Sequence, residues 1–174
     1  MRLLLTGLPG VGKTTLIRSV LDRIEEVKCA GFYTAEKRHR GQRIGFKFVT
    51  LDGAEGTLAS VGRKEPTVGK YSVHLEEFER LALRQLDAEN SRADLYVIDE
   101  IGKMELLSQR FRNQVIDLLA HPSNMLATIA KTGKGFIAQL KARNDVELIE
   151  VTRANREGLA GEIADRIRKE FENL

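Results

Sequence analysis

The stretch Gly7–Thr14 constrains the fold of this chain more than any other part of its sequence. It reads GLPGVGKT and matches the pattern G-x-x-x-x-G-K-[ST] at every fixed position. The apolar run Leu3–Leu5 precedes it, and apolar residues at helical spacing follow it. Because the motif lies between an expected strand and an expected helix, it predicts a phosphate-binding loop, also called a Walker A motif.

The residue types in this loop suit a triphosphate. Its glycines, at 7, 10 and 12, let backbone N–H groups come close to phosphate oxygens. Lys13 adds a mobile positive charge, and the helix that begins near it presents unsatisfied N–H groups to an anion. Thr14 places a hydroxyl where Mg²⁺ would bind. The alternative is a glycine-rich turn that binds nothing. The predicted nucleotide-binding residues here are Gly7, Leu8, Pro9, Gly10, Val11, Gly12, Lys13, Thr14 and Thr15.

The rest of the chain predicts one α/β domain over residues 1–174. Apolar strands alternate with amphipathic helices, which indicates a mostly parallel central sheet with helices on both faces. Residues 30–73 differ, because short aromatic or β-branched runs are separated there by Gly-containing turns. We expect this β-rich insertion to form a small antiparallel meander.

Periodicity and turn residues give approximate bounds for the elements. Residues 61–73 are expected to be an irregular surface loop and residues 88–92 a polar break. The expected helices cover residues 13–27, 74–86, 104–119, 136–140 and 155–171. The expected strands cover residues 3–6, 30–36, 43–51, 56–60, 94–100, 125–130 and 146–151.

Composition excludes several classes of protein. No apolar run is long enough for a membrane span or a signal peptide, so we expect a cytoplasmic protein with no membrane partner. Cys29 is the only cysteine and cannot form an internal disulfide, and the three histidines lack metal-ligand spacing. The net charge is +3, and the densest basic cluster is residues 37–43. Nucleic-acid binding there is possible but not favoured, because no aromatic residues interleave with the charges.

A second motif follows the phosphate loop by some ninety residues. Asp99 and Glu100 end the apolar strand DLYVIDE, as in a Walker B motif. Carboxyl ends of parallel strands converge on one crevice, so Asp99 would hold Mg²⁺ opposite Thr14. Glu100 would orient and polarise the water that attacks the γ-phosphate, which favours hydrolysis over transfer to another substrate. The alternative is a pair of acids that end a strand in solvent.

Residues 99–102 also form a D-x-x-G pattern, which GTPases share. A GTPase should carry an Asn-Lys-x-Asp element after a later strand to read guanine. The equivalent residues here, 130–133, read AKTG and contain neither Asn nor Asp. We therefore expect loose base selectivity.

The segment Asp99–Leu106, DEIGKMEL, makes a family resemblance visible. Together with GLPGVGKTT, GFYT at 31–34, RIGF at 43–46, VGKY at 68–71 and Asn155-Arg156, it resembles the THEP1 family of nucleoside-triphosphatases, also described as cancer-related nucleoside-triphosphatases. The resemblance implies a RecA-like sheet and Mg²⁺-dependent hydrolysis of ATP, GTP, CTP, UTP and TTP to diphosphate and phosphate. It also implies nucleotide contacts from the residues Leu95, Tyr96, Val97, Ile98, Asp99, Glu100, Ile101 and Gly102.

Two rival functions remain open at this stage. A small nucleotide or nucleoside kinase of the same fold would use basic residues of 131–145 as a lid, and a nucleic-acid-binding switch would use the basic cluster at 37–43. Arg156 either reaches the nucleotide or neutralises a carboxylate. Glu105 is interpreted as an ordinary helix-start residue. A monomer that binds nucleoside triphosphates is the default, with Lys13 and Glu100 as the catalytic residues.

Overall fold

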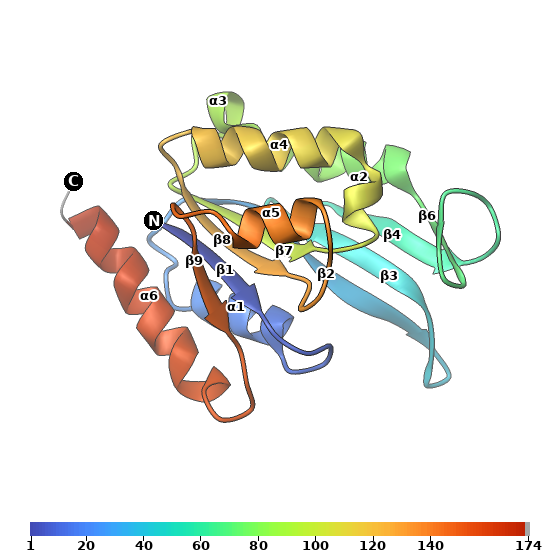
Figure 1. Cartoon of the computed structure of the whole chain (residues 1–174), viewed down its shortest axis with the longest axis horizontal. Helices are drawn as coiled ribbons and strands as arrows, with labels where there is room; N and C mark the ends of the chain where they lie inside the picture. The colour runs from blue at the N-terminus through green and yellow to red at the C-terminus, as the bar shows by residue number, and fades with distance from the viewer. Residues whose placement is uncertain (173–174) are drawn as a thin grey trace.

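One nine-stranded sheet organises the computed structural model, which describes residues 1–172 (Figure 1). The strand order is β5-β6-β4-β3-β2-β7-β8-β1-β9. Neighbouring strands from β2 to β9 in this order pair in parallel, as predicted for the centre of the sheet. The strands are β1 (Arg2–Thr6), β2 (Cys29–His39), β3 (Gln42–Thr50), β4 (Glu55–Val61), β5 (Thr67–Val68), β6 (Tyr71–Val73), β7 (Leu95–Ile101), β8 (Asn124–Ile129) and β9 (Glu147–Glu150).

Helices cover both faces of the parallel strands, as predicted (Figure 1). The side chains of β1 show why, because Leu4 points into one core while Leu3 and Leu5 point into the other. All three are fully buried, as a strand inside a two-sided parallel sheet requires. The helices α1 (Lys13–Leu21) and α6 (Arg156–Glu172) cover the face of Leu3, and α2 (Leu75–Leu81), α4 (Gln109–Ala120) and α5 (Phe136–Lys141) cover the face of Leu4.

The predicted antiparallel meander is present but is continuous with the parallel strands. Residues 29–32 of β2 pair in parallel with β7, and residues 32–39 pair antiparallel with β3. The β-rich residues are therefore an extension of one sheet. The expectation of an irregular loop over residues 61–73 is wrong for its second half, because β5 and β6 form a hairpin there that pairs with β4. Burial of Tyr71 and Val73 explains this pairing.

Three predicted helices are shorter or interrupted. The helix expected to reach Val27 ends at Leu21, and residues 22–27 continue as turns with bonds such as Arg23 N–H to the Val20 carbonyl at 2.9 Å. Ile24 is still buried, so the apolar spacing persists beyond the helix. The helix expected over 74–86 becomes α2 and a 3₁₀ turn at Leu83–Leu86.

Local capping explains two further differences: the short helix within the expected polar break, and the division of the helix expected over 104–119. The expected polar break contains a short helix, α3 (Ala88–Ser91), because the Asp87 carboxylate accepts bonds from the N–H groups at 89 and 90. The helix expected over 104–119 is divided into a 3₁₀ turn at Glu105–Leu107 and α4. Ser108 separates them, since its hydroxyl caps α4 by accepting the Phe111 N–H at 3.0 Å.

The remaining elements match their predicted positions to within three residues. Within residues 1–172, none of the helices combines the length and apolar character that a membrane crossing needs.

Candidate active site

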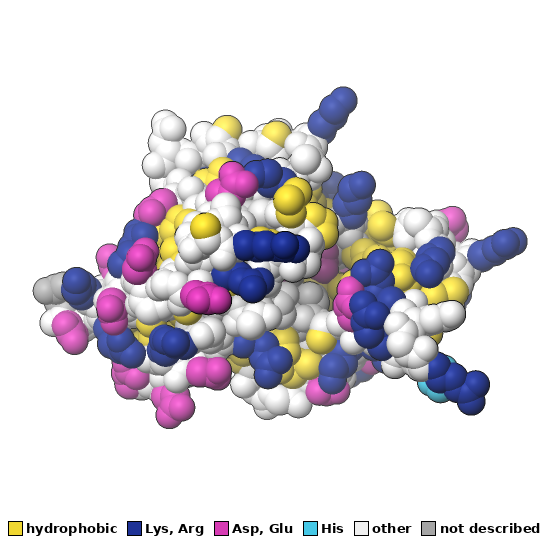
Figure 2. Space-filling model, turned by 90° about the horizontal axis from the view of Figure 1, so that it is seen from below, with side chains coloured by type: hydrophobic (Ala, Val, Ile, Leu, Met, Phe, Trp, Pro, Cys, Tyr) yellow, Lys and Arg dark blue, Asp and Glu magenta, His cyan; other side chains and the backbone are white. Residues whose placement is uncertain are grey.

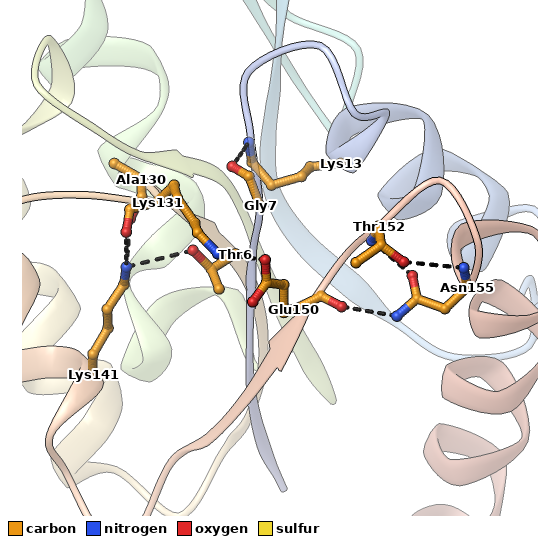
Figure 3. Close-up of polar contacts among 9 residues, drawn as sticks. All are labelled: Thr6, Gly7, Lys13, Ala130, Lys131, Lys141, Glu150, Thr152 and Asn155. Atoms are coloured by element: carbon orange, nitrogen blue, oxygen red, sulfur yellow. Dashed lines mark hydrogen bonds and ion pairs between the residues drawn. The ribbon is translucent and has the colours of Figure 1, made fainter.

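The phosphate loop follows β1 directly, and two of its glycines are required by geometry. A side chain on Gly7 would meet the Val151 carbonyl oxygen at 2.6 Å. Gly12, the N-cap residue of α1, has φ +105°, a conformation that favours glycine. The buried Lys13 that follows donates from Nζ to the Gly7 carbonyl at 3.2 Å, so its ammonium group lies back against the loop (Figure 3).

Asp99 is brought to this loop by β7 and is held on both carboxylate oxygens. Thr14 Oγ1 donates to its Oδ2 at 2.6 Å, and Thr128 Oγ1 donates to its Oδ1 at 2.6 Å. The Thr34 N–H approaches Oδ2 at 3.5 Å. Burial raises the pKa of Asp99, and the two hydroxyls, the Thr34 N–H and the Lys13 charge act against that rise. The residues of the two predicted motifs therefore meet in the structure.

Glu100 follows Asp99 on β7 and is half-buried at the same edge of the sheet. Burial raises its pKa, the Lys13 charge lowers it, and the Asp99 charge raises it. A carboxylate with a raised pKa is a better proton acceptor than an ordinary surface glutamate. The position suits the general base predicted from the sequence.

Glu105 is more deeply placed than the sequence indicated. It is 5% exposed, and a side chain on Gly102 would meet its Oε2 at 3.0 Å. Burial raises the pKa of Glu105 from 4.5 to about 8, and the charges of Glu100 and Asp99 add to that rise. Glu105 opens the 3₁₀ turn Glu105–Leu107, as expected of a helix-start residue, but its carboxyl is buried inside the protein, which the sequence did not indicate.

Six of the other predicted nucleotide-binding residues divide into two groups by exposure. Leu8, 65% exposed, and Thr15 are accessible on the loop and on α1. The side chains of Leu95–Ile98 are 0–1% exposed and pack in the two cores on either side of β7. The side chains of these four residues therefore lie in the cores, and the nucleotide contacts that the family resemblance implied for this stretch stay a prediction. Their burial fixes the strand that carries Asp99 to the edge.

Thr128 is the site residue that the sequence analysis missed. It lies on β8, between the strands that carry the loop and Asp99. It is fully buried, and its hydroxyl finds its acceptor in Asp99. A polar residue near the end of the apolar run MLATIA was the available signal, because a buried hydroxyl needs a partner.

Arg156 opens α6 next to the phosphate loop. Its Nη1 donates to the Val11 carbonyl at 3.1 Å, and among residues 1–172 it forms no ion pair with a carboxylate. The interpretation that Arg156 neutralises a nearby acid is therefore wrong for the described part of the chain.

Most basic residues of 131–145, the segment that a kinase would use as a lid, form hydrogen bonds or ion pairs within the protein. Lys141 donates to the carbonyls of Ala130 at 2.7 Å and Lys131 at 2.8 Å, and Lys131 itself pairs with Glu150 on β9 (Figure 3). Arg143 pairs with Asp145 at 2.7 Å. Few cations are left in this segment to close over a phosphate.

The basic cluster at the tip of the β2–β3 hairpin is partly neutralised. Glu36 pairs with both Arg38 at 2.6 Å and Arg43 at 2.8 Å. Figure 2 shows Lys and Arg side chains gathered toward this end of the molecule, and mixed with Asp and Glu over the rest of the face. The arrangement resembles a solvated hairpin tip.

Comparisons with known proteins agree with this geometry. A family model described as NTPase matches residues 2–164. The nucleoside-triphosphatase THEP1 of Thermotoga sp. (strain RQ2) is 46% identical over 164 residues, which cover 94% of this chain and 93% of that protein. The chain belongs to the THEP1 family of nucleoside-triphosphatases.

Solved structures from the THEP1 family share the fold. The crystal structure of THEP1 from the hyperthermophile Aquifex aeolicus has a TM-score of 0.84 and 34% identity, covering 94% of this chain and 96% of that one. The solution structure of a human cancer-related nucleoside triphosphatase has a TM-score of 0.82 and 41% identity, covering 97% of each. The P-loop NTPase fold expected from the sequence is confirmed.

Proposed function

We propose that this chain hydrolyses nucleoside 5′-triphosphates to nucleoside diphosphate and phosphate, with Mg²⁺ and with broad acceptance of bases, among them those of ATP, GTP, CTP, UTP and TTP. Membership of a family of nucleoside-triphosphatases supports hydrolysis in general. The observation that carries the proposal is the 2.6 Å bond from Thr14 to Asp99, with Lys13 and Glu100 beside it.

The donor set at Thr14 and Asp99 fits Mg²⁺. Both offer hard oxygen ligands, and residues 1–172 contain no cluster of three or more His, Cys, Asp or Glu that would suit a fully protein-held metal. A site with one or two protein oxygens is typical of Mg²⁺ that takes its other ligands from phosphates and water. When bound, Mg²⁺ would supply positive charge to the phosphate oxygens. Asp99 must be ionised to bind it.

The chain's own residues would divide the chemistry as follows. Lys13 leaves the Gly7 carbonyl and donates to the β- and γ-phosphates, where its charge stabilises the transition state. Glu100 accepts a proton from water, whose oxygen forms the new bond to the γ-phosphorus while the bond to the β–γ bridging oxygen breaks. The diphosphate leaves with that oxygen. No acceptor other than water is needed.

Hydrolysis is favoured over the kinase alternative by the engagement of the lysines at 131 and 141. The direct test is the release of inorganic phosphate from each of the triphosphates with Mg²⁺, with no acceptor added and with EDTA as control. Comparable turnover of all of them, abolished by EDTA, is expected. A preference of about 10²-fold or more for one base would contradict broad specificity, and release that requires an acceptor would favour the kinase.

A further inference from the structure

A cavity of about 430 Å³ adjoins the phosphate loop between α1 and α6. Its volume falls in the range of roughly 300 to 1,000 Å³ that is typical of small-molecule sites. It is lined by Gly12, Thr15, Leu16, Ser19, Arg156 and Glu157.

The cavity adjoins the start of α1 on a different side from Asp99. Thr14 faces Asp99, whereas the next residue, Thr15, lines the cavity. Successive helical residues point in different directions, so the two threonines separate the two ends of a bound triphosphate. With the γ-phosphate toward Asp99, the α-phosphate end leads past Thr15 into the cavity.

Arg156 forms one wall of this cavity, close to the loop backbone. A side chain on Gly12 would meet Arg156 Nη1 at 3.5 Å and its Cδ at 3.7 Å. Among the described residues, the guanidinium forms one hydrogen bond, which Nη1 donates to the Val11 carbonyl. The planar Arg156 guanidinium, with most of its N–H donors not bonded to described residues, therefore lies beside the expected path of the nucleoside.

Two of the polar side chains around the cavity are already hydrogen-bonded within the protein. The side-chain amide of Asn155 is consumed by its own turn, since Nδ2 donates to the Glu150 carbonyl at 2.8 Å and Oδ1 accepts the Thr152 N–H at 2.8 Å (Figure 3). The hydroxyl of Ser19 accepts a bond from Arg23. The cavity still offers the Thr15 hydroxyl, the Glu157 carboxylate and the flat face of the Arg156 guanidinium, and of these only the flat face suits every base.

We propose that this cavity receives the nucleoside of the bound nucleotide and that the guanidinium of Arg156 stacks on its base without reading its edges. The inference rests on the proposed function and deepens it. Every base has a π-face, so stacking against a planar cation tolerates all of them. Arg156 would then be a binding residue responsible for broad base acceptance.

The test measures affinities by calorimetry for ATP, GTP, CTP, UTP and inorganic tripolyphosphate, each with Mg²⁺. Arg156→Ala should weaken all the nucleotides by roughly 10-fold and tripolyphosphate by less than about twofold. Arg156→Lys should weaken the nucleotides nearly as much, because an ammonium has no plane to stack, although it keeps the charge. Arg153→Ala is the matched control, since Arg153 is exposed nearby and lines no part of the cavity, and it should change nothing.

Three results would overturn the inference. Equal weakening of nucleotides and tripolyphosphate would mean that Arg156 only braces the loop through Val11. A loss confined to bases with an exocyclic amino group would assign recognition to the Glu157 carboxylate. Unchanged affinities in both Arg156 variants would place the base elsewhere. Failure of the parent protein to bind any nucleotide would instead contradict the proposed function, and Arg156→Lys keeps the test valid if Arg156→Ala does not fold.

Discussion

The carboxyl edge of the parallel sheet holds two buried or half-buried lysines in opposite circumstances. Lys141 donates to the Ala130 and Lys131 carbonyls at 2.7 and 2.8 Å and approaches the Thr6 hydroxyl at 3.4 Å. Lys13 is 9% exposed, and among residues 1–172 its one hydrogen bond is the 3.2 Å contact with Gly7. Lys141 directs its three donors at two backbone carbonyls and a hydroxyl, whereas Lys13 has two donors without a partner among the described residues.

The difference separates a structural cation from a ligand-binding one. A buried charge with unspent donors costs free energy in the unliganded protein, and a bound anion removes that cost. The same reasoning sets the crevice around Lys13 apart from the ends of β8 and β9, although both regions are rich in charge. Hydrogen-bond satisfaction distinguishes the two regions where residue type does not.

The largest effect is expected from Lys13→Met. Phosphate release should fall by about 10²- to 10³-fold, because the variant removes a donor to the transition state. The free energy of unfolding should not fall, since a buried and incompletely paired ammonium is removed. Steady-state phosphate assays and urea unfolding measure the two quantities. A clear loss of stability would show that Lys13 belongs with Lys141 as a structural residue.

The next effect concerns the buried carboxyl under the crevice. The pKa of Glu105 is raised to about 8. As the pH rises from about 4.5 toward 8, the unfolded chain has released this proton and the native protein has not, so the stability of the parent should fall. Between about pH 6 and pH 7.5 the fall should be on the order of 2 kcal/mol.

Glu105→Gln should remove this part of the pH dependence, because its side chain does not titrate. Urea unfolding of both proteins at the two pH values measures the difference. Parallel losses of stability in parent and variant would contradict the placement of a neutral Glu105.

A smaller effect is expected from Thr128→Val, which keeps the shape and removes the hydroxyl that bonds Asp99. The pKa of Asp99 should rise further, because that bond lowers it. As the pH is lowered, the variant should then lose activity at a higher pH than the parent does. The Mg²⁺ concentration for half-maximal rate should rise by about 10-fold. Titration of the rate with Mg²⁺ and pH measures both. Unchanged Mg²⁺ dependence would remove Thr128 from the site.

The smallest effect on activity is expected from Lys141→Met. Turnover per folded molecule should remain within about twofold of the parent, while stability falls by about 1 to 2 kcal/mol because two carbonyls lose their donor. The assays used for Lys13→Met apply unchanged, which makes the two variants a matched pair. A large loss of turnover at parental stability would move Lys141 into the phosphate site.

The sequence predicted local chemistry well and spatial neighbours less well. The loop at 7–14 and the acids at 99–100 could be identified because each motif lies within one short stretch. The order of the strands, with β8 between β1 and β7, comes from long-range packing and leaves little trace in periodicity. Thr128 was missed for that reason.

Element boundaries failed where local capping or tertiary burial decided them. Ile24 kept the helical spacing although α1 had ended, and Ser108 divided one expected helix into two elements. The burial of Glu105 depends on how the turn at 102–105 folds under the crevice, which residue type does not reveal. The hairpin of β5 and β6 was hidden by its glycines and Pro66, which are typical of loops.

The most direct test of the hydrolysis mechanism replaces Glu100 with Gln. The side chain keeps its size but can no longer accept a proton, so single-turnover phosphate release from Mg²⁺-ATP should fall by at least about 10²-fold. Nucleotide affinity should stay within about twofold of the parent, because Lys13, Thr14 and Asp99 are intact. Phosphate release at the parental rate in Glu100→Gln would contradict the central claim that Glu100 activates the attacking water.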